Sequence, residues 1–143
     1  MASRIPARYR RPMLRTTLFA ILLALPSAAT ARPLSGPEFR AATEGFTLYF
    51  ETEQGEYFGA EQYLENGETL WLPREGQCVP GLWRAREEKI CFVYYDEIDC
   101  WRTYGEGGEL IEAVTADPGD DRLALKVVRK EKVPLLCPEG PGV

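Results

Sequence analysis

Short stretches of alternating apolar and polar residues, separated by tight turns, recur along most of this chain. Residues 46–51 and 123–128 show the alternation most clearly. A period of two places successive side chains on opposite faces of a strand, so both segments are expected to be half-buried β-strands.

Further strands are expected in runs rich in aromatic and β-branched residues, at 57–64, 68–72, 82–86, 90–95, 100–104 and 110–116. Turn residues separate these runs. Asn66-Gly67 is a strong hairpin signal, and glycine-rich or Asp-Pro-Gly sequences follow at 105–108 and 117–120. The predicted fold is therefore all-β, an antiparallel meander of about eight short strands that closes into a barrel or packs as a sandwich.

One short helix is expected before the first strand. Ser35 and Glu38 have the spacing of a capping box, which predicts a helix near 35–43. Beyond residue 133 the chain contains Pro134, Pro138 and Pro141. Proline cannot continue a strand ladder, so we expect an irregular tail that Cys137 ties down.

The first 31 residues resemble a signal peptide. Five arginines precede an apolar run at 18–25, and Ala29-Thr30-Ala31 fits a signal-peptidase site. We expect the mature chain to begin at Arg32, to contain no transmembrane segment, and to work in the periplasm or outside the cell. Residues 32–143 are the size of one domain.

The predicted mature chain is strongly acidic. It keeps 12 of the 17 basic residues against 22 acidic ones, a formal net charge of −10. This charge argues against nucleic acid and anionic lipid as partners. A cationic protein is permitted as a partner, and solubility alone is the other explanation of the charge.

Four cysteines in a small exported chain predict two disulfides that staple the domain. A zinc site is not expected, because the chain has no histidine and no Cys-x-x-Cys spacing. Partners must share an end of the sheet, because bridged Cα atoms lie within about 7 Å. Sequence leaves three connectivities open; meander geometry favours Cys78 with Cys100 and Cys91 with Cys137 over Cys78 with Cys91 and Cys100 with Cys137.

Catalysis is not expected, because the chain lacks the usual general base, histidine. An enzyme built on this chain would have to use carboxylates, such as those of Glu87-Glu88 or of residues 96–99. The alternative interpretation is that these acidic residues lie in solvated turns. Asp117, Asp120 and Asp121 could offer oxygen ligands to Ca²⁺, but an ordinary turn explains them too. No cofactor or metal is predicted.

Aromatic residues on neighbouring predicted strands form the candidate binding patch. Its members are Trp71, Trp83, Trp101, Tyr94, Tyr95 and Tyr104, with Arg102 beside them. The run 90–95 is apolar on both faces, which a strand with one face in water does not need. The alternatives are an exposed patch that binds a ligand, glycan or protein, and a core with a covered outer face.

A cysteine and tryptophan signature runs through the middle of the chain. Cys78-x-x-Gly81-x-Trp83 is followed by Cys91-Phe92-x-Tyr94 and by Cys100-Trp101. This signature, with 59–64 upstream, resembles short exported proteins of Gram-negative bacteria over roughly residues 45–104. The resemblance implies export and a β-fold, and it implies no catalytic residue.

Together these observations predict a monomeric, non-enzymatic periplasmic protein that binds a ligand or associates with the envelope. Two alternatives remain. One is an acidic inhibitor of a cationic hydrolase such as lysozyme, whose encounter the negative charge would accelerate. The other is a carboxylate-dependent glycan hydrolase.

Overall fold

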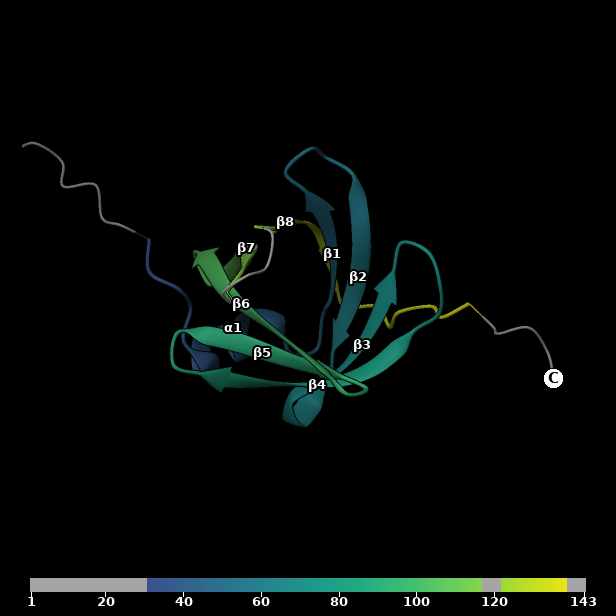
Figure 1. Cartoon of the computed structure of the whole chain (residues 1–143), viewed down its shortest axis with the longest axis horizontal. Helices are drawn as coiled ribbons and strands as arrows, with labels where there is room; N and C mark the ends of the chain where they lie inside the picture. Colours follow the sequence, from purple (N-terminus) through teal and green to yellow (C-terminus); the bar gives the residue numbers. More distant parts are fainter. Residues whose placement is uncertain (1–30, 117–121, 139–143) are drawn as a thin grey trace, which may run out of the picture.

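Eight antiparallel strands form a closed barrel, as the all-β meander predicted (Figure 1). The structure is a computed structural model that describes residues 31–116 and 122–138. The strands are β1 (Thr47–Thr52), β2 (Tyr57–Tyr63), β3 (Glu68–Pro73), β4 (Val79–Arg86), β5 (Lys89–Tyr94), β6 (Glu97–Glu106), β7 (Glu109–Thr115) and β8 (Ala124–Glu131).

Pairing of the first and last strands distinguishes this barrel from a sandwich. Each strand pairs with the next along the chain, and β8 returns to pair with β1 from Thr47 opposite Glu131 to Thr52 opposite Leu125. Closure leaves inward and outward side chains alternating along the strands. Phe50 of β1 and Leu125 of β8 are both buried on the inner side.

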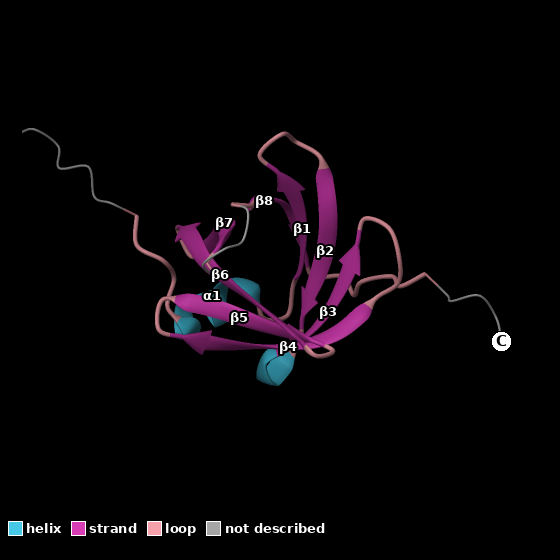
Figure 2. Ribbon diagram, viewed as in Figure 1, coloured by secondary structure: helices cyan, strands magenta, loops and turns pink. Residues whose placement is uncertain are grey.

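Helix α1 (Gly36–Thr43) closes one end of the barrel (Figure 2). The predicted capping box is present: the Ser35 hydroxyl accepts from the Glu38 N–H, and the Glu38 carboxylate accepts from the Ser35 N–H. The helix points Phe39, which is fully buried, into the barrel. Its ring makes edge contacts with Tyr63, Trp83 and Phe92 at centroid distances of 5.6, 4.9 and 6.2 Å.

The turn at Asn66-Gly67 lies where the sequence predicts it, between β2 and β3. Both residues have positive φ, 59° and 79°, which explains why asparagine and glycine occur there. Two strands begin three residues earlier than expected. β4 begins at Val79 rather than residue 82, and β6 begins at Glu97 rather than residue 100.

The structure contains two disulfides, but our predicted pairing is wrong. Cys91 is bonded to Cys100 and Cys78 to Cys137, with Cα–Cα distances of 4.0 and 5.5 Å. The early start of β6 explains the error. Cys100 lies inside that strand, directly opposite Cys91 in the β5–β6 register, rather than at the end of the sheet near Cys78.

The C-terminal tail crosses the outside of the barrel before it reaches Cys78. Past β8, the Val133 carbonyl accepts from the Thr47 hydroxyl, and the Leu135 N–H donates to the Gln62 side chain. In Figure 1 the tail, in yellow, passes behind β2 and β3. It is irregular, and Cys137 fastens it as expected.

Three sequence predictions lie outside the described residues. They are the signal peptide, apart from its last residue Ala31, the turn at 117–120, and the possible calcium ligands Asp117, Asp120 and Asp121. Among the residues that are described, no helix has the length and apolar character needed to cross a bilayer. The two disulfides indicate an oxidising compartment.

Candidate binding site in the barrel

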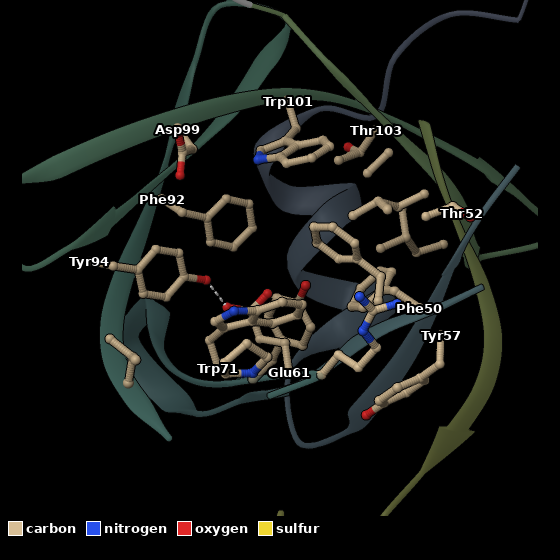
Figure 3. A pocket seen from close by; sticks show the side chains of 18 of the residues that line it. Phe50, Thr52, Tyr57, Glu61, Trp71, Phe92, Tyr94, Asp99, Trp101 and Thr103 are labelled. Atoms are coloured by element: carbon tan, nitrogen blue, oxygen red, sulfur yellow. Dashed lines mark hydrogen bonds between the residues drawn. The ribbon is translucent and has the colours of Figure 1, made fainter. Parts of the chain in front are cut away.

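The barrel encloses a cavity of about 710 Å³, to which all eight strands and α1 contribute. Phe39 of α1 lies at its floor, and residues at or near the β1–β2, β3–β4 and β5–β6 turns surround its mouth, among them Glu56, Arg74 and Tyr95. Figure 3 looks into this space with the helix behind the side chains. A volume of this size is typical of pockets for small organic molecules.

Aromatic rings form a large part of the cavity wall. Figure 3 shows the rings that point inward from several strands, namely Phe50, Trp71, Phe92, Tyr94 and Trp101. The rings of Phe92 and Tyr94 are parallel, with centroids 6.1 Å apart. Aromatic side chains offer a large apolar contact area to a ligand.

Two glycines allow two of these rings to lie flat against neighbouring strands. A Cβ on Gly59 would be 2.4 Å from the ring of Trp71, and one on Gly81 would be 2.5 Å from the ring of Tyr94. Gly81 and Tyr94 are directly paired in the β4–β5 register. The glycines therefore set where Trp71 and Tyr94 stand in the wall.

Glu61 of β2 is a buried carboxyl group in this aromatic wall. Its side chain is 4% exposed, and the Tyr94 hydroxyl donates a hydrogen bond to Oε1 (Figure 3). Burial raises the pKa of Glu61 to about 7, against the opposing effect of the Tyr94 hydrogen bond. The same burial, with the nearby Glu61 charge, raises the pKa of Tyr63 and of Tyr94, so both remain protonated donors.

Charged residues around the cavity are predominantly acidic. The lining contains the carboxyl groups of Glu56, Glu61, Glu75, Glu97 and Asp99, and one basic side chain, Arg74. Most of these groups lie toward the mouth, whereas Glu61 is deeply buried. The potential inside a low-dielectric cavity with this composition favours cations over anions.

One buried hydroxyl in the cavity wall, that of Thr103, lacks a hydrogen-bond partner within the described part of the chain. Thr103 is 1% exposed. Thr103 lines the cavity on β6, next to Trp101 in Figure 3. Buried polar atoms are normally hydrogen-bonded, so Thr103 is available to a polar group of a ligand.

Four of the seven residues predicted to form a binding patch come together here. Trp71, Tyr94 and Trp101 line the cavity inside the barrel, and Tyr95, which is 78% exposed, lies at its mouth.

The other three patch residues lie elsewhere. Trp83 is buried under α1, against Phe39 and the Arg40 guanidinium. Arg102 and Tyr104 alternate along β6 with the inward-facing Trp101 and Thr103, so they belong to the outer face.

The two candidate carboxylate clusters are separated in the structure. Glu87 and Glu88 are exposed in the β4–β5 turn, at the end of the barrel that α1 closes. Glu97 and Asp99, from the second cluster, line the cavity. In the described ranges, no three cysteine or acidic side chains are placed to hold a metal ion.

Glu61 is the candidate site residue that the sequence analysis does not single out. It lies in the predicted strand 57–64, two residues from Tyr63, and so shares a strand face with an aromatic side chain. The sequence signal for a site at Glu61 is that this carboxylate shares a strand face with Gly59 and Tyr63. Whether that face points into the barrel depends on the strand register, which the local sequence does not determine.

Fold and site together define an up-and-down eight-stranded barrel that encloses an aromatic cavity with one buried carboxyl group. Comparison of the chain with protein-family models, with curated proteins and with solved structures found no match.

Proposed function

We propose that this protein binds a small, largely apolar molecule inside its barrel and has no catalytic role. The observation that carries the proposal is the cavity itself. It has a volume of about 710 Å³, a floor formed by Phe39, and an aromatic wall drawn from several strands. Side chains alone fill the interior of many small barrels, whereas this interior has room for a ligand.

The arrangement also favours binding on energetic grounds. Apolar surface transferred from water into the cavity contributes about 25 cal/mol per Å². Disulfides and strand closure hold the walls in place before binding, so little ordering free energy is lost when a ligand enters.

Fluorescence of an uncharged apolar probe, N-phenylnaphthylamine, tests the proposal. We expect the fluorescence of the probe to increase on binding to the native protein, and to increase least with a variant whose cavity is filled. Ala113→Phe places a ring in the cavity, because Ala113 lines it and is 8% exposed. Its matched control is Ile111→Phe on the same strand, at a side chain that is 46% exposed and does not line the cavity.

The expected result is saturable binding by the native protein and by Ile111→Phe, with at least tenfold weaker binding, roughly 1.4 kcal/mol, by Ala113→Phe. Near-ultraviolet circular dichroism shows whether each variant keeps its tertiary packing. Equal probe affinity in a folded Ala113→Phe protein, or no saturable binding by the native protein, would refute a ligand site in the barrel.

We further propose that the protein acts in the periplasm or outside the cell. The signal-like sequence at 1–31, the resemblance to exported Gram-negative proteins, and the two disulfides support this location. Sequencing the N-terminus of the exported protein tests it. The expected first residue is Arg32, and an intact N-terminus would contradict the prediction.

A carboxylate-dependent glycan hydrolase is the second candidate function. Glu61 is buried with a pKa raised to about 7, and Glu97 and Asp99 line the same cavity in more exposed positions. Carboxyl groups in unlike environments can divide acid and base roles. Activity on oligosaccharides that disappears in both Glu61→Gln and Asp99→Asn would favour the enzyme over the binding protein.

A further inference from the structure

We infer that the molecule bound in the barrel is an organic cation, an amine with an aromatic or alkyl body, whose ammonium group pairs with Glu61. This inference rests on the proposed binding function and names its ligand class. Three observations carry it: the partners of Glu61, the rings around it, and the balance of charge along the cavity.

Glu61 has hydroxyl partners but no basic one. The Tyr94 hydroxyl donates to it, Tyr63 lies nearby, and no arginine or lysine of the described residues pairs with it. A buried carboxylate is costly unless a cation compensates its charge. Inside the cavity, an ammonium group would supply that missing charge.

Rings beside Glu61 suit a cation as well as an apolar body. Trp71 is directly opposite Glu61 in the β2–β3 register, the Tyr94 hydroxyl donates to the Glu61 carboxyl group, and both rings line the cavity. Ammonium groups are attracted to the faces of tryptophan and tyrosine rings, most strongly where water is excluded. A carboxylate with flanking rings therefore recognises an amine by two independent interactions.

Charge along the entrance acts in the same direction. The cavity lining carries five carboxyl groups and one arginine, Arg74, which is exposed near the mouth. An anionic ligand would have to pass the acidic groups and leave Glu61 without a partner. A neutral apolar ligand would gain apolar contact only. A neutral ligand with a polar group would also gain a hydrogen bond to Thr103.

Three probes with the same phenylbutyl body test the inference: phenylbutylamine, phenylbutanol and phenylpentanoate. Isothermal titration calorimetry at pH 8 keeps the amine protonated and lies above the pKa of Glu61. The expected order of affinity is amine, then alcohol, then carboxylate. A charge-assisted hydrogen bond makes the amine about ten- to a hundredfold tighter than the alcohol.

Glu61→Gln isolates the role of the carboxylate. We expect this variant to lose the preference for the amine, so that it binds the amine and the alcohol with similar affinities. Glu68→Gln is the matched control, because it removes the same charge from an exposed residue at the start of β3, outside the cavity. That control should keep the full preference.

Each possible result separates the two proposals. Equal binding of alcohol and amine, or a preference for phenylpentanoate, overturns the amine inference and leaves the cavity site intact. An amine preference that survives in Glu61→Gln also overturns the inference. Failure of all three probes to bind refutes the inference and counts against the cavity site itself.

Discussion

Replacing Glu61 with glutamine should change how the stability of the protein depends on pH. The pKa of Glu61 is about 7 in the folded chain, against 4.5 for an ordinary glutamate. A raised pKa means that the folded state holds its proton more tightly than the unfolded state. The stability that the protonated group contributes is complete below pH 4.5 and is lost as the pH rises through 7.

The size of this loss follows from the pKa difference. Each pKa unit corresponds to about 1.4 kcal/mol, so Glu61 should lower the free energy of unfolding by about 3 kcal/mol between pH 4 and pH 8. Glutamine does not titrate, and its amide can still accept the hydrogen bond from Tyr94. The difference in stability between native protein and Glu61→Gln therefore isolates this one group from the other acids.

Urea unfolding at several pH values, with disulfides intact, measures the effect. We expect Glu61→Gln to gain about 3 kcal/mol relative to the native protein between pH 4 and pH 8. Glu68→Gln serves as the control and should follow the native profile, because Glu68 is exposed. A difference between native protein and Glu61→Gln that stays constant over this range would refute the raised pKa and, with it, the buried position of the carboxyl group.

Three further predictions concern the parts that hold the cavity together. Phe39→Ala should lower the free energy of unfolding by about 3–5 kcal/mol, because a fully buried ring is removed; urea unfolding measures this, and a change under 1 kcal/mol would show that the ring is not the floor of the barrel. Ser35→Ala should lower the free energy of unfolding by about 1 kcal/mol, because the helix loses its N-cap; an unchanged free energy in the same assay would contradict this. Replacing both Cys78 and Cys137 with serine should lower the free energy of unfolding by about 4 kcal/mol in the chain-entropy model. Peptide mapping of the native protein tests the pairing itself, and a peptide that links Cys78 to any other cysteine would disprove it.

Local patterns were sufficient to predict most of the fold. The period of two in β1 and β8, the Asn66-Gly67 turn and the capping box at Ser35 each depend on neighbouring residues only, and each is present in the structure. The sequence does not decide between a barrel and a sandwich, because closure depends on the pairing of β1 with β8, two strands at opposite ends of the domain. No local pattern reports that contact.

The same distinction explains the errors at the candidate site. The acidic sequence 96–99 has the composition of a turn, yet Glu97 and Asp99 are in β6, where their partners on β5 override that preference. Because β6 begins at Glu97, Cys100 lies inside the strand opposite Cys91, and not at the strand end where the sequence analysis expects it. Glu61 was missed for a related reason, since a carboxylate in a strand reads as solvent-facing until the barrel register places it inside.

The bond between Cys78 and Cys137 makes the second half of the domain a covalent ring. The two cysteines are 59 residues apart, and β4 to β8 all lie between them. A protease that cuts one peptide bond in any turn of this ring produces no separate fragment, because the two new ends stay joined through sulfur. A nicked molecule would migrate as a single species until reduced, whereas one cut in the β1–β2 turn would leave the N-terminal piece held by noncovalent contacts alone.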